Sequence, residues 1–242
     1  MLGLYIGIIL LLNIPYVQHR MSVLVAKELS TVLGSELTVG RINIGLLNRI
    51  IIDDLVLNDQ SGKELLKIGR LSAKFEILPL FSGKISIGNV QLFSFNANLE
   101  RPTPQASTNF QFVLDAFASK DTVKKKSNLD LRINSLLIRR GKVSYDVLSA
   151  ESTPGKFNPQ HIRLSNILAN ISLKALQNDS VNAAIKRMSV EEEHSGFELK
   201  KLSLKIIANN RKMRIENFAI DLPNTSLAMD TIRMEYDSLE SL

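Results

Sequence analysis

Apolar residues along this chain recur in the order apolar, two non-apolar residues, apolar, any residue, apolar. The stretch IGNVQL, from Ile87 to Leu92, is one example, and INSLLI, from Ile133 to Ile138, is another. Side chains of a continuous strand alternate between its two faces, so Ile87 would lie on one face and Val90 and Leu92 on the other. The spacing therefore predicts a bulge, a bend or a turn that keeps the apolar side chains on one side.

The same spacing occurs in many other parts of the chain. A random order of the same composition would give roughly six or seven matches, so their number alone is weak evidence. Their placement is stronger evidence, because none lies in residues 1–38 or 93–132. The further matches are VGRINI from Val39, LNRIII from Leu47, IDDLVL from Ile52, IGRLSA from Ile68, LSNILA from Leu164, IKRMSV from Ile185, LKKLSL from Leu199, IENFAI from Ile215 and MDTIRM from Met229.

Two β architectures satisfy this pattern. One is an elongated, curved sheet that folds lengthwise into a trough with an apolar concave face, and the other is a closed β-sandwich core. We expect a mainly β protein of the trough kind, with an N-terminal membrane-anchor helix and short amphipathic helices. The predicted lining of the trough consists of Ile87, Val90, Leu92, Ile133, Leu136 and Ile138.

The N-terminal segment, MLGLYIGIILLLNIPYV, is apolar almost throughout. As a helix it would span about 25 Å. No small-residue cleavage pattern follows it, so an uncleaved anchor over residues 1–19 is favoured over a removed signal peptide. The next segment, from Met21 to Gly34, predicts an amphipathic helix that ends at the glycine.

The remaining chain divides into three further regions. Residues 20–100 are expected to contain the amphipathic helix and the first β region. Residues 101–128 carry Pro, Ser, Thr and a lysine run, which predicts a mobile insert with a short helix near Phe110 to Phe117. Residues 129–242 are expected to continue the β region.

Composition and motifs limit the ligands and the enzymatic activities that are compatible with this chain. The net charge of +6 favours acidic surfaces, including anionic lipid head groups, but no basic and aromatic stripe supports nucleic-acid binding. His19, His161 and His194 show no metal-ligand spacing. Asp53 and Asp54 are adjacent and are expected to point to opposite faces of a strand, so they would not form a carboxylate pair. We therefore predict no enzymatic activity, no catalytic residues, no metal and no cofactor.

The order of these segments resembles a known family. An apolar N-terminal segment, an amphipathic helix that ends in LG, then LTVGRINIGLLNRIIIDDLVLND and LDLRINSLLIRRGKVSYD are similar to the N-terminal part of the AsmA-like family. The resemblance covers roughly residues 1–150 well and the rest more loosely. It implies an elongated, groove-shaped β structure that is anchored once in the bacterial inner membrane and extends into the periplasm. The partners it implies are phospholipid acyl chains, the inner membrane and an outer-membrane β-barrel assembly protein.

Three functions are compatible with this sequence. The chain could conduct phospholipid between the inner and outer membranes, or serve as a scaffold or chaperone for outer-membrane proteins through strand addition at its sheet edges. The third alternative is an anchored structural or binding domain with a closed sandwich core. The sequence does not separate the first two.

Overall fold

The computed structural model describes residues 3, 7, 10–45, 48–75, 85–117, 129–130, 134–177, 180–209 and 211–235. Its helices within these ranges are α2 (Pro15–Leu33) and α4 (Gln111–Phe117). The strands are β1 (Leu37–Gly45), β2 (Arg49–Asn58), β3 (Glu64–Phe75), β4 (Ile85–Arg101), β5 (Leu129–Asp130), β6 (Ser135–Val147), β7 (His161–Gln177), β8 (Ser180–Glu192), β9 (Phe197–Ala208), β10 (Lys212–Asp221) and β11 (Ser226–Glu235). The prediction of a mainly β chain is confirmed.

All of these strands belong to one open sheet. Their order is β1-β2-β3-β4-β6-β7-β8-β9-β10-β11, and β5 pairs with β4 outside this path. Neighbours on the path are antiparallel except β4 and β6, which run parallel because the chain passes through the α4 region between them. The described strands therefore form a single mixed sheet, and not the two packed sheets of a sandwich.

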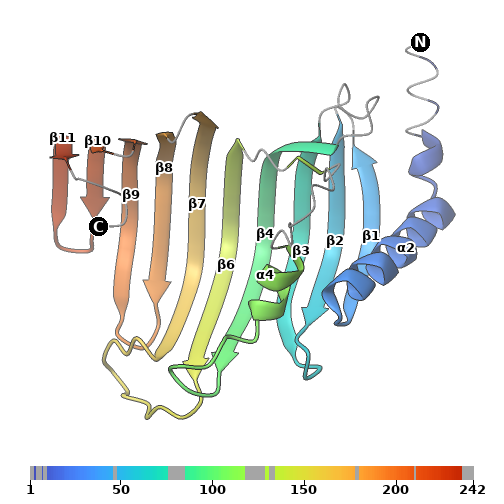
Figure 1. Cartoon of the computed structure of the whole chain (residues 1–242), viewed down its shortest axis with the longest axis horizontal. Coiled ribbons are helices and arrows are strands. Elements are labelled where there is room, and N and C mark those ends of the chain that lie inside the picture. The colour runs from blue at the N-terminus through green and yellow to red at the C-terminus, as the bar shows by residue number, and fades with distance from the viewer. Residues whose placement is uncertain are drawn as a thin grey trace.

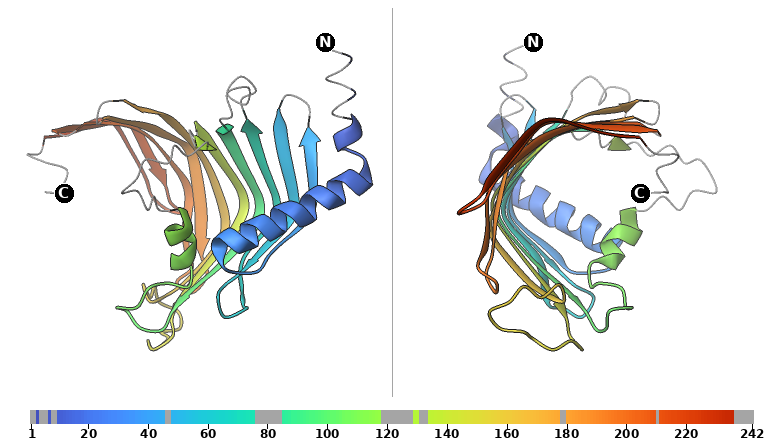
Figure 2. Two further views of the ribbon diagram at one scale, coloured as in Figure 1. Left: turned by 45° about the vertical axis from the view of Figure 1, so that its right-hand side comes forward. Right: turned by 90° about the vertical axis from the view of Figure 1, so that its left-hand side faces the viewer.

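The sheet is curved, and both helices lie on its concave side (Figure 1). Figure 2 shows the curvature from two further directions, with α2 and α4 inside the arch. The helices cover the part of the sheet near β1 to β4. Within the described residues, no helix covers the concave face from β7 to β11.

The best-buried part of the protein lies between these helices and the sheet. A cluster of buried leucines joins Leu33 of α2 to Leu37, Leu57 and Leu65 of the first strands. Leu29 and Ala26 of α2 pack against this cluster, as do Phe112, Val113 and Ala116 of α4. The helices thus stabilise one end of the sheet by covering its apolar surface.

Helix α2 differs in extent from the helix that the sequence predicts. It begins at Pro15 and runs continuously past the expected boundary between residues 19 and 20. It ends as expected at Gly34, whose φ of 64° is left-handed, a conformation that glycine adopts readily. Among the described residues, no helix has both the length and the apolar character needed to cross a membrane. The expected anchor over residues 1–19 stays a prediction.

The short helix expected in the insert is present as α4. Before it, the chain is held to β4 by three bonds of Asn109. Its backbone N–H donates to the Glu100 carbonyl at 2.8 Å, its side-chain NH₂ donates to the Asn98 carbonyl at 3.1 Å, and its Oδ1 accepts from the Glu100 N–H at 2.9 Å. The predicted mobile insert spans residues 101–128, and of these, residues 118–128, including Lys124 to Lys126, lie outside the described residues.

Irregular positions recur across the sheet and bend its strands: those from β1 to β7 form a line, and a further one lies on β10. Five strand residues other than glycine have left-handed backbone, with φ between 51° and 56°: Asp54, Ser94, Arg140, Asn166 and Asn217. At these positions the pairing between strands skips or shifts, for example between Glu216 and Ala219. Such a residue interrupts the alternation of side chains and bends the strand.

These irregular positions explain many of the polar pairs in the sequence pattern. Asp54, Asn166 and Asn217 are each the second polar residue of a match, and Gly40 and Gly69 occupy matching positions in β1 and β3. The register on β1 and β2 passes directly from Val39 and Leu55 to Arg41 and Asp53, skipping Gly40 and Asp54. The prediction that the pattern marks bends within strands is confirmed at these positions.

Candidate functional site

An unbroken row of apolar side chains crosses the sheet beside the line of bends. Leu92 of β4 lies opposite Leu71 of β3 on one side and Ile138 of β6 on the other. Directly opposite residues on neighbouring strands share a face of the sheet. From β1 to β11 the row reads Ile42, Ile52, Leu71, Leu92, Ile138, Ala169, Met188, Leu202, Ile220 and Leu227.

A second apolar row lies beside the first on the same face, two residues away on each strand that it crosses except β8, where a bulge makes the separation three. Val90 of β4 is its central member, between Ala73 of β3 and Leu136 of β6. From β1 to β9 this row reads Ile44, Ile50, Ala73, Val90, Leu136, Ile171, Ile185 and Leu204. We call the two rows together the apolar rows.

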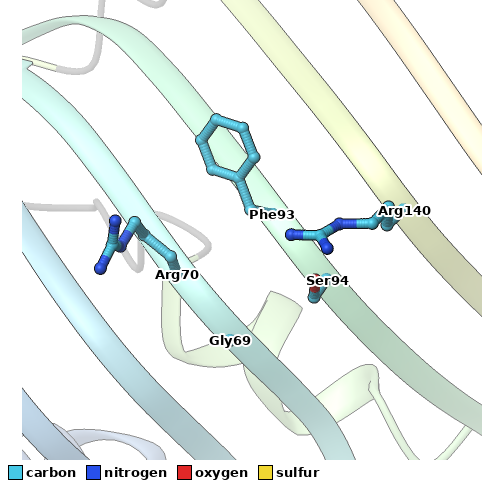
Figure 3. A pocket seen from close by; sticks show the side chains of 5 residues that line it. All are labelled: Gly69, Arg70, Phe93, Ser94 and Arg140. Atoms are coloured by element: carbon cyan, nitrogen blue, oxygen red, sulfur yellow. The ribbon is translucent and has the colours of Figure 1, made fainter.

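The apolar rows lie on the concave face. Figure 3 looks onto the sheet from the side opposite to Figure 1, because its strands run from blue to yellow in the reverse order. It shows the side chains of Arg70, Phe93 and Arg140 on this convex side. Arg70 and Phe93 are opposite each other in the register, so their neighbours Leu71 and Leu92 point to the concave side, where the helices lie.

The structure brings together four of the six residues predicted to line the trough. Val90 and Leu92 of β4 lie beside Leu136 and Ile138 of β6, respectively, and all four side chains are half-buried. The backbone of Ile87 lies in β4 opposite Phe75. The side chain of Ile87 and all of Ile133 lie outside the described residues.

The remaining members of the apolar rows were not singled out from the sequence. All of them except Ile171 and Leu227 lie within stretches that match the spacing, for example Ile42 in VGRINI and Met188 in IKRMSV. The signal that could have grouped them is the polar pair of each match. On antiparallel neighbours the second polar residue of one match lies opposite the first of the other, as Arg41 does with Asp53 and Asp53 with Arg70. Without the register, the sequence gives no reason to place β4 next to β6.

Protein cover over this face decreases toward β11. Ile42 is 3% exposed near α2, whereas Leu227 at the far end of the same row is 46% exposed. Met229 and Met234 on β11 are also exposed. A contiguous apolar surface of this kind is typical of a binding site for an apolar ligand or another apolar surface.

On the convex face, behind the apolar rows, the side chains near the bends of β3, β4 and β6 are largely polar. The Arg70 guanidinium bonds the Asp53 carboxylate at 2.6 Å, and the Arg139 guanidinium lies over the Phe93 ring at 6.0 Å. A hollow of about 360 Å³ opens here, lined by Gly69, Arg70, Phe93, Ser94 and Arg140 (Figure 3). The lining contains consecutive residues of β3 and of β4, as expected where a bend places two neighbours on one face.

The same geometry corrects the interpretation of the two adjacent aspartates. The hydrogen bond that Arg70 donates to Asp53 is the main cause that raises the pKa of Arg70, and the negative charge of Asp54 acts in the same direction. A Cβ on Gly40 would lie 3.0 Å from the Cβ of Asp54, directly across the bend. Asp54 has left-handed backbone, so the alternation assumed from the sequence fails at this position. Asp53 forms the ion pair with Arg70, and the charge of Asp54 makes only a smaller contribution.

A cluster of charged groups holds the ends of β6 and β7 together. His161 Nδ1 lies 2.9 Å from Asp146 Oδ1, and its Nε2 lies 3.0 Å from the Ala150 carbonyl oxygen. Both partners are acceptors, so this arrangement favours the imidazolium form, which donates from both nitrogens. The hydrogen bond with Asp146, followed by that with Ala150, raises the pKa of His161. With both nitrogens occupied, this ring holds the strand ends and lacks a free atom for proton transfer.

Glu192 has a similar structural role at the turn after β8. Its side chain is almost fully buried and accepts bonds from the Ser195 hydroxyl and from the backbone N–H groups of Ser195, Arg163 and His194. Burial acts to raise the pKa of Glu192, but these donors lower it to about 2. Among the described residues, no three His, Cys, Asp or Glu side chains are grouped so as to hold a metal ion.

Comparison with known proteins adds no assignment. The chain matches no protein-family model, and no curated protein matches it.

Proposed function

We propose that this chain is the β-groove region of an inner-membrane protein whose concave face carries phospholipid acyl chains across the periplasm. The observation that carries the proposal is the row from Ile42 to Leu227, which is apolar on every strand that it crosses. Acyl chains lying along such a face would remain in an apolar environment from strand to strand. The single-pass inner-membrane location and the transfer between inner and outer membranes rest on the resemblance to the AsmA-like family.

The energetics favour a mobile apolar ligand. Each buried methylene contributes about 0.8 kcal/mol, so many weak contacts hold an acyl chain without one dominant anchor. A ligand held in this way exchanges one set of leucine, isoleucine and valine contacts for an equivalent set as it moves. Transport then needs no catalytic residue.

A second function is supported by the exposed edge of β11. In the described residues this strand pairs only with β10, and its side chains are exposed except at Ile232. An extended segment of another protein can add to such an edge. Within the AsmA-like family, the chain is similar to the translocation and assembly module subunit TamB, whose family role implies a β-barrel partner and outer-membrane protein assembly. The concave apolar rows do not require such a partner, so we favour phospholipid.

Native mass spectrometry of the purified chain tests the proposal. We expect phospholipid to remain bound, and a photo-crosslinking residue at Leu92 or Ile138 to capture it in cells. The matched control is Gln91, the neighbour of Leu92 that points to the convex face, where lipid capture should be absent. Crosslinks from Leu92 to outer-membrane proteins alone would support the scaffold function, and crosslinks only within the chain would contradict both.

A further inference from the structure

The first half of helix α2 has an inverted distribution of polar and apolar side chains. Gln18 and Ser22 face the sheet and are only 8% and 1% exposed. On the outward side, Tyr16, Val23 and Leu24 are more than half exposed. A helix that faces water places its apolar side chains toward the protein, so this arrangement is the opposite of the usual one.

The inward polar side chains fasten the helix to the edge of the sheet. Gln18 Nε2 donates to Asn43 Oδ1 of β1 at 2.6 Å. The buried Ser22 hydroxyl bonds within the helix instead, donating to the Gln18 carbonyl at 3.0 Å. Just before the helix, Asn13 Nδ2 donates to the Ile44 carbonyl of β1 at 2.8 Å. The position of α2 relative to β1 is therefore fixed by named bonds, and its outward face is presented in a defined direction.

The outward apolar surface continues into the residues before the helix. Leu10, Leu11 and Ile14 are 66%, 57% and 49% exposed. We call these three residues, together with Tyr16, Val23 and Leu24, the outer apolar surface. Beyond Leu24 the exposed side chains become mainly polar, with Lys27, Glu28 and Thr31 exposed and Val32 the one exposed apolar side chain in the rest of the helix.

The charge on this surface indicates what covers it. Residues 10–27 contain no Asp or Glu, whereas Arg20 and Lys27 are positive. The Arg20 guanidinium donates to the Tyr16 hydroxyl at 3.0 Å and lies over the Tyr16 ring at 5.4 Å. Exposed leucine and valine beside a tyrosine and basic residues are typical of helices that lie at the boundary between acyl chains and anionic head groups.

We propose that the outer apolar surface lies in the interfacial layer of an anionic phospholipid bilayer, with Leu24 near its boundary and Lys27 among the head groups. Because α2 is bonded to β1, this contact places the β1 edge of the sheet at the membrane. The strands from β2 to β11 are then stacked away from it, and the concave face begins beside the lipid. The inference rests on the membrane location in the proposed function, and not on lipid transport.

Site-specific fluorescence on the full chain tests this placement. The chain has no cysteine, so single cysteines in place of Leu10, Leu24 or Thr31 can each carry an NBD group. The labelled proteins are reconstituted into vesicles of phosphatidylethanolamine and phosphatidylglycerol. We expect NBD at Leu24→Cys to emit at shorter wavelength and to lose most of its signal to nitroxide-labelled lipids. The matched control is Thr31→Cys, on the same side of the helix beyond the surface, where iodide in the water should quench instead.

Each other outcome has a distinct meaning. Iodide quenching at Leu24→Cys would overturn the inference, while lipid quenching at Leu10→Cys would still leave the membrane location intact. Protection of Leu24→Cys from both quenchers would mean that protein covers the surface, which also overturns it. Iodide quenching at both Leu10→Cys and Leu24→Cys would remove the membrane location from the proposed function. Lipid quenching at Leu24→Cys without bound phospholipid on the concave face would support the inference and contradict the conduit.

Discussion

The ring of Phe95 on β4 lies against the backbone of Gly141 on β6, where both strands bend. A Cβ added at Gly141 would overlap the Phe95 ring. We therefore expect Gly141→Ala to displace the ring and to lower the free energy of unfolding by about 1–3 kcal/mol, the usual cost of overpacking. Urea denaturation of the purified variant measures this change.

A double-mutant cycle identifies the cause of that loss. In a Phe95→Leu background the clash with the ring is absent, so Gly141→Ala should cost less there. Gly45→Ala serves as a matched control, because its Cβ would have only ordinary contacts, the nearest at 3.5 Å. An equal loss in both backgrounds would mean that the ring is not responsible.

The left-handed residues of the bends give a second prediction. Asn217 has a φ of 53°, a conformation that glycine adopts freely and β-branched residues disfavour. We expect Asn217→Val to destabilise the protein by about 1–2 kcal/mol, and Asn217→Gly to have a much smaller effect. Equal unfolding midpoints for the two variants would show that the bend at this strand does not need left-handed backbone.

The charged cluster around His161 predicts a pH dependence of stability. The hydrogen bond with Asp146 raises the pKa of His161 above 6.5, its value in an unfolded chain. A raised folded-state pKa gives stabilisation that is complete below pH 6.5 and is lost as the pH rises through the folded-state pKa. The midpoint of urea unfolding should therefore fall over this range. In His161→Gln this component should disappear, and an unchanged pH profile would contradict the role of the imidazolium.

Glu192 predicts the opposite dependence at acid pH. Its donors lower its pKa from 4.5 to about 2. The stabilisation is therefore complete above pH 4.5 and is lost as the pH falls toward 2. Glu192→Gln removes the charge and places an amide NH₂ among donors, which should cost about 1–3 kcal/mol at neutral pH. Its exposed neighbour provides the control: Glu193→Gln should leave both the stability and its acid dependence unchanged.

The spacing of apolar residues predicts that the strands contain bends, but it does not predict the order in which the strands pair. Asn166 and Asn217 lie in the expected spacing. A bend there places two adjacent polar residues on the convex face, so the apolar residues before and after them share the concave face. Ser94 and Arg140 bend their strands equally, but FSF and IRRG break the spacing, so the sequence gives no local signal there. The parallel pairing of β4 with β6 depends on the path of the intervening chain, which no period in the sequence encodes. The inverted burial of α2 was also hidden, because a helical pattern does not show which face meets protein.

The final prediction concerns Val90, at the centre of the second apolar row. Its side chain is half-buried between those of Ala73 and Leu136, so a carboxylate there would still reach water in the unliganded protein. An acyl chain laid over it would remove that water, at a cost of several kcal/mol. We therefore expect Val90→Asp to fold, to unfold at nearly the same urea concentration, and to retain much less phospholipid in native mass spectrometry. Gln91→Asp introduces the same charge on the convex face and should retain lipid as the unmodified chain does. If Val90→Asp instead unfolds the protein, and crosslinks from Val90, Leu92, Leu136 and Ile138 reach only protein, this part of the sheet is a closed core and not a groove.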